Sequence, residues 1–122
     1  MSKTILIVDD NELIRKSLAA ALISNELDVE TAQNGKDGLR IALDKQPDVI
    51  VTDVHMPEMT GLEMIEKLRT DEWGKKVPII VMTVDEGTES INKAMEAGVT
   101  VYISKNMNDP ASIVDQIKTA LG

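Results

Sequence analysis

Short apolar runs alternate along the chain with longer segments in which apolar residues recur every three or four positions. The first pattern is typical of buried strands and the second of amphipathic helices. Five of each occur, without an internal linker or repeat. The predicted strands are Thr4–Val8, Leu27–Thr31, Asp48–Asp53, Val77–Met82 and Val99–Ser104. This alternation predicts consecutive βα units in a single domain over residues 1–122.

The predicted helices have recognisable starts and ends. Asn11 and Thr60 are suited to cap helices, Asn34–Gly35 to turn the chain into one, Asp109–Pro110 to open the last, and Gly98 to end the fourth. Gly74 and the Lys75–Lys76 pair are expected in an exposed connection. The side chains expected to face the core are Ile14, Leu18, Ala21 and Leu22, then Gly38, Leu39, Ala42 and Leu43, then Leu62, Met64, Ile65 and Leu68, then Ile91, Ala94 and Met95, then Ile113, Val114, Ile117 and Leu121.

The strand patterns also suggest an order across the sheet. The first, third and fourth runs are continuously apolar, as central parallel strands are, whereas the second and fifth alternate, as edge strands can. The order 2-1-3-4-5 satisfies this pattern with right-handed crossovers. The sequence therefore predicts a three-layer, flavodoxin-like (βα)5 fold of the α/β class around a parallel five-stranded sheet.

Charged and polar residues follow four of these strands. Asp9 and Asp10 follow the first strand, Asp53 the third, Thr83 the fourth and Lys105 the fifth. The carboxyl ends of parallel strands share one edge, where ligands bind in this architecture. Three carboxylates there repel one another unless a cation or raised pKa values relieve the repulsion. Mg²⁺ suits such oxygen ligands and leaves room for a phosphoryl group, which Asp53 can accept, Thr83 can hydrogen-bond and Lys105 can neutralise.

Composition narrows the function classes. The chain has 122 residues, no cysteine and a single histidine, which excludes disulfides, thiol catalysis and a histidine-cluster zinc site. A net charge of −8 argues against direct binding to nucleic acid. No segment approaches membrane-spanning length, and the first apolar run is too short for a secretory signal, so the expected location is the cytoplasm.

These motifs together resemble a response-regulator receiver domain of the single-domain, chemotaxis-like length. The matching residues are Asp9–Asp10, Asp53-x-x-Met56-Pro57-x-x-x-Gly61, Thr83, Tyr102 and Lys105. The resemblance implies a signalling switch of a two-component phosphorelay, in which a histidine kinase or histidine phosphotransfer protein phosphorylates Asp53 with Mg²⁺ bound. It also implies that the protein does not turn over an external substrate.

The same resemblance implies roles for individual residues. Asp10 and Asp53 would bind the metal directly with the main-chain carbonyl of His55, and Asp9 mainly through water. Phosphorylation would draw Thr83 inward and let Tyr102 repack. The surface formed by the fourth helix, fifth strand and last helix would then change, and an output protein of unknown identity would read it.

Some positions depart from the family pattern or lie at its variable points. Asn106 follows Lys105 where proline is common, so a cis bond there is not expected. Val84 stands where alanine or glycine is usual, and its branched side chain predicts slower loss of the phosphoryl group. His55 and Asp85 lie two residues after Asp53 and Thr83, and are expected to tune its lifetime in either direction.

Other functions remain open at this stage. The main alternative is a receiver-like interaction module that works without phosphorylation, which Val84 and Asn106 keep open. A Mg²⁺-dependent phosphatase with an aspartyl nucleophile would need a second acid two residues after Asp53, and this chain has His55 there. Flavin binding is disfavoured because the acidic first βα loop would repel a cofactor phosphate.

Overall fold

The structure is a computed structural model that describes residues 2–84, 87–106 and 109–122. Its five parallel strands lie in the order β2-β1-β3-β4-β5, as predicted. The strands are β1 (Thr4–Val8), β2 (Asp28–Ala32), β3 (Val49–Thr52), β4 (Ile79–Thr83) and β5 (Val101–Ser104). The helices are α1 (Glu12–Ser24), α2 (Gly35–Lys45), α3 (Gly61–Leu68), α4 (Thr88–Glu96) and α5 (Pro110–Leu121).

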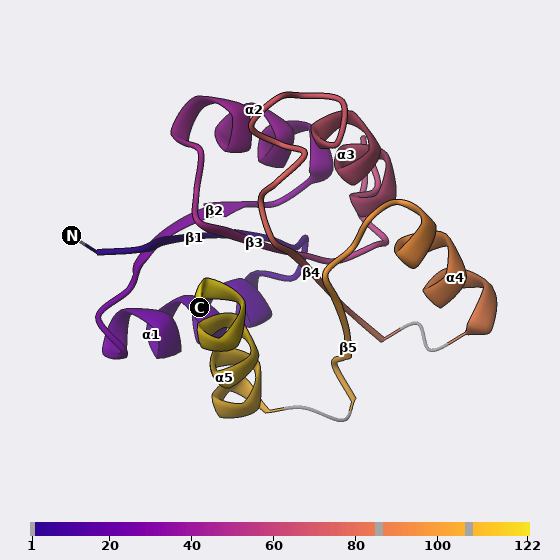
Figure 1. Cartoon of the computed structure of the whole chain (residues 1–122). Coiled ribbons are helices and arrows are strands. Elements are labelled where there is room, and N and C mark those ends of the chain that lie inside the picture. Colours follow the sequence, from indigo (N-terminus) through magenta and orange to yellow (C-terminus); the bar gives the residue numbers. More distant parts are fainter. Residues whose placement is uncertain (1, 85–86, 107–108) are drawn as a thin grey trace.

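Helices cover both faces of the sheet, with α1 and α5 on one face and α2, α3 and α4 on the other (Figure 1). Alternate residues of β1 contribute to the hydrophobic cores on both faces of the sheet. Ile5 and Ile7 pack toward α1 and α5, whereas Leu6 and Val8 pack toward α2 and α3. The central strands β3 and β4 are fully buried, β1 is buried except at Thr4, and the edge strands β2 and β5 are only partly buried. The predicted three-layer α/β fold is confirmed.

The predicted helix starts are confirmed by their capping bonds. The side chains of Asn11, Asn34, Thr60 and Asp109 each accept a hydrogen bond from a main-chain N–H in the first turn of the helix that follows. Thr60 and Glu63 form a reciprocal capping box. Gly98 follows the end of α4 with a φ of +92°, a conformation that glycine adopts without strain.

Two strand starts lie two residues later than predicted, at Ile79 and Val101. Pro78 has no N–H to donate to a ladder. The N–H of Val99 bonds the carbonyl of Ala94 and so closes the turn that ends α4. Apolar character alone does not separate such residues from the strands that they precede. The remaining boundary differences are of one residue.

Three burial predictions are wrong. Leu43 and Met95 are 43% and 53% exposed, because α2 and α4 rest on their small neighbours Ala42 and Ala94, which are fully buried. A helical residue is rotated by about 100° from its neighbour, which turns the larger side chain outward. Gly74 is buried rather than exposed, since its N–H bonds the Asp71 carboxylate at 2.9 Å and its carbonyl accepts from Arg69.

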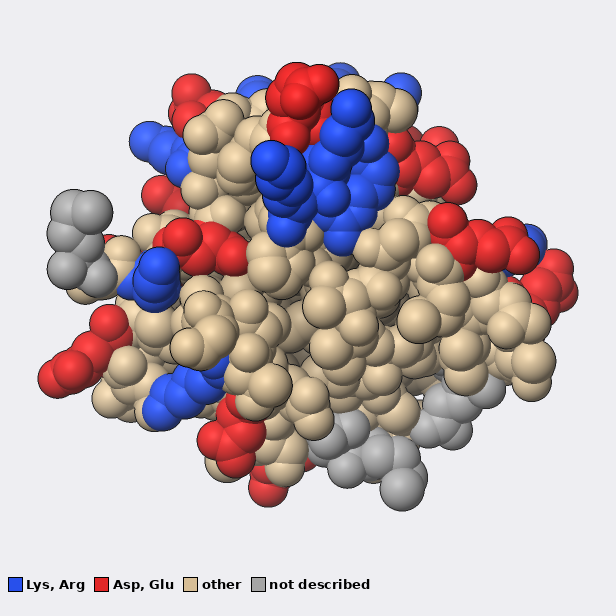
Figure 2. Space-filling model, viewed as in Figure 1, with Lys and Arg blue, Asp and Glu red and all other residues tan. Residues whose placement is uncertain are grey.

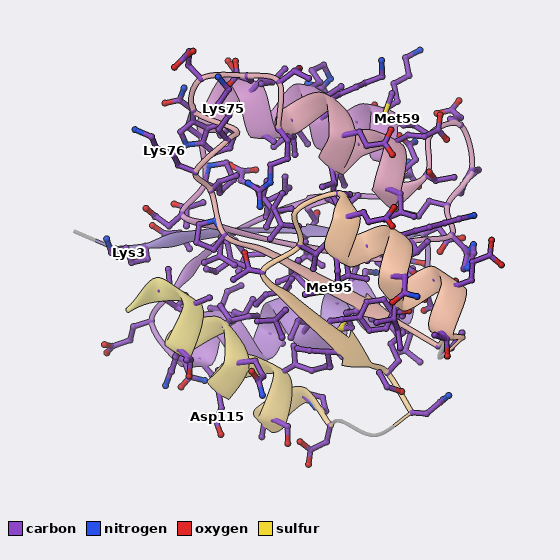
Figure 3. All side chains as sticks on the ribbon, turned by 45° about the vertical axis from the view of Figure 1, so that its right-hand side comes forward. Lys3, Met59, Lys75, Lys76, Met95 and Asp115 are labelled. Atoms are coloured by element: carbon purple, nitrogen blue, oxygen red, sulfur yellow. The ribbon has the colours of Figure 1, made fainter. Side chains whose placement is uncertain are left out.

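The other expectations for the α3–β4 connection hold. Lys75 and Lys76 are exposed, as predicted, and point away from the ribbon (Figure 3). Within the described residues, no helix has the length and apolar character needed to cross a membrane.

Candidate functional site

The carboxyl ends of β1, β3, β4 and β5 bring the predicted site residues to one edge of the sheet. Main-chain bonds fix this arrangement. The main-chain N–H of Asp53 donates to the carbonyl of Val8 at 2.9 Å, and the main-chain N–H of Lys105 donates to the carbonyl of Thr83 at 2.9 Å. Asp9, Asp10 and Asp53 each present a carboxylate oxygen within 4.8 Å of the others. Asp9 and Asp53 are buried and Asp10 is exposed, so the cluster opens to solvent on one side.

Lys105 connects two of these carboxylates. Its Nζ lies 2.7 Å from Asp9 Oδ2 and donates to Asp53 Oδ2 at 2.9 Å. The other Asp53 oxygen, Oδ1, accepts from Val54 N–H at 2.6 Å and from His55 N–H at 3.4 Å. Both oxygens of Asp53 therefore face hydrogen-bond donors that keep the carboxylate in one orientation.

Burial and charge act in opposite directions on the pKa values of the Asp9–Lys105 pair. Burial raises the pKa of Asp9, and Lys105 offsets only part of that rise. Burial alone would lower the pKa of Lys105, but hydrogen bonds and charge from Asp9 and Asp53 outweigh it, so the net pKa is raised. Both pKa values are therefore raised, but for different reasons. Burial prevails at Asp9, which is fully buried, whereas the neighbouring carboxylates prevail at Lys105.

The acidic cluster fits a hard divalent cation. Three carboxylates face one ammonium group, which leaves an excess of negative charge. Asp9 Oδ2 is buried and, among the described residues, accepts no hydrogen bond of good geometry, although Lys105 Nζ is close. Carboxylate oxygens with open solvent on one side are the donors that Mg²⁺ takes in proteins.

The start of α3 holds the loop that carries Asp53. Gly61 N–H donates to Val54 at 2.8 Å, and Thr52 Oγ1 donates to the Asp53 carbonyl at 2.9 Å. A Cβ on Gly61 would overlap that carbonyl, so only glycine fits this close approach. Met56, in the same loop, is buried. The glycine of the sequence motif therefore has a packing reason.

The other predicted residues lie on β4, β5 and the loops at this end of the sheet. Thr83 is fully buried at the end of β4, and Val84 after it is 59% exposed. His55 is exposed, with its main-chain N–H toward Asp53. Tyr102 is half-buried on β5 and packs against the core layer of α2, α3 and α4. Asp85 lies outside the described residues.

The loop after β5 departs from the usual family pattern at Asn106. The Lys105–Asn106 peptide bond is trans, as are the other described bonds. Asn106 N–H donates to Ser104 Oγ at 3.2 Å. Lys105 reaches both Asp9 and Asp53 with this loop geometry.

Arg15 touches the site, although the sequence reasoning did not single it out. Its Nη1 donates to the carbonyl of Asp9 at 2.8 Å. The only indication of this contact in the sequence is that Arg15 lies on the predicted first helix, one residue after the inward-facing Ile14. An arginine on a helix is usually solvated, so this spacing alone does not identify a contact.

Comparison with known proteins now assigns the family. Residues 5–118 match the model of the response regulator receiver domain. The chain belongs to the response regulator receiver domain family. Receiver domains are signalling switches of two-component systems rather than enzymes that turn over a substrate, and they interact with histidine kinases and output partners.

Relatives of this receiver domain include short and long response regulators. It is 30% identical over 122 residues to the polar-differentiation response regulator DivK of Brucella anthropi, covering 100% of this chain and 98% of DivK. It is 36% identical over 105 residues to the response regulator MprA of Mycolicibacterium vanbaalenii, covering 86% of this chain. The matched region is only 45% of MprA, so the chain spans less than half of that relative.

Solved structures share the fold of this receiver domain. The chemotaxis response regulator CheY4 of Vibrio cholerae superposes with a TM-score of 0.91 at 29% identity, covering 98% of this chain and 99% of that one. The receiver domain of the sensor histidine kinase PA1611 of Pseudomonas aeruginosa has a TM-score of 0.91 at 25% identity, covering 100% and 99%. That structure has a magnesium ion coordinated in its active site cleft.

Proposed function

We propose that this receiver domain accepts a phosphoryl group on Asp53 with Mg²⁺ bound, and that the modification changes the surface of α4, β5 and α5. The observation that carries the proposal is the environment of Asp53. Its carboxylate is buried, oriented by the Val54 N–H and Lys105, and adjacent to two further acids. This combines an oriented nucleophile with the charges needed around a phosphoryl group.

The proposed metal ligands are Asp10, Asp53 and the main-chain carbonyl of His55, with Asp9 acting mainly through water. Bound Mg²⁺ would supply positive charge to spread the charge of the phosphoryl oxygens. The magnesium ion in the PA1611 receiver supports this assignment. Loss of Mg²⁺ affinity in Asp10→Ala is the direct check, and unchanged affinity would contradict the ligand set.

The proposed reaction uses the Asp53 carboxylate as the nucleophile. One carboxylate oxygen attacks the phosphorus of a phosphohistidine on a kinase or phosphotransfer protein and forms an acyl phosphate. The P–N bond breaks, and its electron pair stays on the imidazole nitrogen. Lys105 Nζ then exchanges its contact with the Asp53 carboxylate for one with a phosphoryl oxygen, and the Thr83 hydroxyl donates to another. The proposed location of this reaction is the cytoplasm.

An uncharged stretch lies over β5 between α4 and α5, with acidic and basic side chains above it and to either side (Figure 2). Met95 of α4 is more than half exposed, and Tyr102 of β5 is half-buried. We assign this face to the output protein, because charge-poor, partly apolar surface is what the core of a protein interface uses. Inward movement of Thr83 would let Tyr102 repack and so change the face that the partner contacts.

The decisive experiment combines Mg²⁺, a small-molecule phosphodonor and intact-mass measurement. A labile phosphoryl adduct is expected on the wild type and on Asp48→Asn, a control at an exposed acid outside the site, but not on Asp53→Asn. An unmodified wild type would favour the phosphorylation-independent interaction module instead. An equal adduct on Asp53→Asn would place the acceptor elsewhere.

Val84 is proposed to set the lifetime of the phosphorylated state, together with His55 and Asp85. Its branched side chain stands directly after Thr83, where it narrows the path of attacking water. Val84→Ala should therefore speed phosphate loss from Asp53, by several-fold, in a single-turnover decay assay. Leu43→Ala is a matched control, because Leu43 is an exposed aliphatic residue on α2. Equal decay in Val84→Ala and the wild type would remove Val84 from this role.

A further inference from the structure

A small polar recess lies on the edge of the sheet away from β5. Its volume is about 250 Å³, and its walls come from α1, the end of β2 and α2. These helices cover opposite faces of the sheet (Figure 1), and both contact the edge strand β2. The lining residues are Arg15, Thr31, Ala32, Gln33, Asp37, Arg40 and Ile41. None of them belongs to the Asp9, Asp10 and Asp53 cluster.

The recess carries more positive than negative charge. Two arginines, Arg15 and Arg40, line it together with one acid, Asp37. Asp37 Oδ2 already accepts from the Asn34 side chain at 3.3 Å. Within the described part of the chain, no carboxylate lies within 4.0 Å of either guanidinium group. A cationic recess is unusual for a chain with a net charge of −8, and it concentrates anions locally.

The side chain of Arg15 is held in place at the recess, unlike a freely moving surface charge. Its Nη1 is held by the Asp9 carbonyl at 2.8 Å, which fixes the planar group at the wall. A guanidinium group has five N–H donors in a rigid fork, so most of them stay available for a second acceptor. Thr31 and Gln33 line the recess at the end of β2, and their hydroxyl and amide groups are uncharged donors that can add to those of Arg15.

We propose that this recess binds a small tetrahedral oxyanion of the phosphate class. Two guanidinium groups on different helices can contact different oxygens of one phosphate, whereas a planar carboxylate has only two oxygens to share between them. The volume admits a phosphate group but is below the range of about 300–1,000 Å³ typical of drug-sized ligands. Because Arg15 also holds the carbonyl of Asp9, the bound anion contacts a residue that positions the acidic cluster. The site is nevertheless independent of phosphorylation at Asp53.

The test is an NMR titration of the ¹⁵N-labelled chain with inorganic phosphate, without Mg²⁺ and at constant ionic strength. Saturable shifts are expected at the amides of Thr31 and Gln33 and at the Arg15 side chain, with phosphate binding more tightly than acetate. Arg40→Gln should weaken phosphate binding about tenfold, the effect of losing charge-assisted hydrogen bonds. Arg40 is exposed, so this variant should melt at the wild-type temperature.

Two controls separate this site from general charge and from Asp53. Lys36→Gln removes an exposed cation of the same helix that does not line the recess, and it should leave binding unchanged. Asp53→Asn should also bind normally, since the recess does not use that residue. Unsaturable shifts, equal loss in Lys36→Gln and Arg40→Gln, or shifts centred on Val54 and Lys105 would each overturn the proposal.

Discussion

Helices α3 and α4 both follow a central strand at the edge that carries the site, but they are attached in different ways. α3 has eight residues, a capping box at Thr60 and four buried residues. α4 has nine residues, no side-chain cap at Gly87 and only one buried residue, Ala94. The loop before α3 carries Asp53, whereas the loop before α4 begins at Val84, directly after Thr83.

The difference assigns separate mechanical roles to the two loops. Many buried contacts and satisfied caps raise the free energy of local opening, and few contacts lower it. The Asp53 side is therefore fixed, as the proposed role of Asp53 as a nucleophile requires, and the α4 side can rearrange at low cost. The far end of α4 is tied down, because Arg69 Nη2 donates to the Gly98 carbonyl at 2.6 Å. Rearrangement should therefore concentrate at the start of α4.

The largest expected effect contrasts a buried side chain of α3 with the exposed Met95 of α4. Ile65→Ala in α3 should lower the free energy of unfolding by about 3 to 5 kcal/mol, because Ile65 is fully buried and truncation leaves a cavity. Met95→Ala in α4 should cost less than about 1 kcal/mol, since half of that side chain is already exposed. Urea denaturation measures both values. Similar losses would mean that the two helices are attached equally well.

The next effect tests the connection between the two sides. Lys105 joins the end of β5 to the ends of β1 and β3 through its bonds with Asp9 and Asp53. Lys105→Met leaves these two buried carboxylates without that cation and should cost about 3 kcal/mol in metal-free buffer. Added Mg²⁺ should restore part of the loss, since it supplies the missing charge. Lys75→Met, at an exposed lysine, is the control and should change stability little.

The pH dependence of that effect has a defined sign. The pKa of Lys105 is raised by folding, so its stabilisation is fully present below the ordinary value of 10.5 and is lost as pH rises through the folded value. The stability difference between the wild type and Lys105→Met should therefore shrink above pH 10.5. Asp9 changes stability in the same direction but in an acidic pH range, because its raised pKa makes the folded state bind protons more readily, and stability falls as pH rises above 3.8. A constant difference at high pH would contradict the ion pairs.

The sequence predicted the fold and the acidic cluster for a physical reason. Strand order follows from which runs are apolar throughout, and parallel topology then brings the residues after the strands to one edge. The sequence did not reveal which way α2 and α4 are rotated, and so Leu43 and Met95 were assigned to the core. The rotation of each helix about its axis depends on close packing at small residues, such as Gly38 against Val8. The spacing of apolar residues does not reveal this packing. The contact of Arg15 with Asp9 was missed because it joins a side chain to a main-chain carbonyl.

A smaller effect tests why the Asp53 loop tolerates only glycine at its end. Gly61→Ala places a Cβ against the Asp53 carbonyl and should cost about 2 kcal/mol while displacing the loop. The rate of phosphorylation should fall as well, since the Asp53 carboxylate is oriented from that loop. Glu66→Ala, at an exposed α3 position, is the control and should preserve both quantities. If Gly61→Ala were destabilised but phosphorylated at the normal rate, the position of this loop would not control the reactivity of Asp53.

The smallest effect exchanges the two helix starts. Thr60→Gly removes the hydroxyl that accepts from Glu63 N–H at 3.2 Å, and Gly87→Asn introduces a side chain able to cap α4. The first should cost, and the second gain, no more than about 1 kcal/mol, because glycine is itself a fair cap residue. Hydrogen exchange at the first turn of each helix resolves such changes. If opening at the start of α4 accompanies signalling, Gly87→Asn should also reduce the change that phosphorylation produces in that turn. If phosphorylation changed exchange in that turn as much in Gly87→Asn as in the wild type, the start of this helix would not be the element that the switch moves.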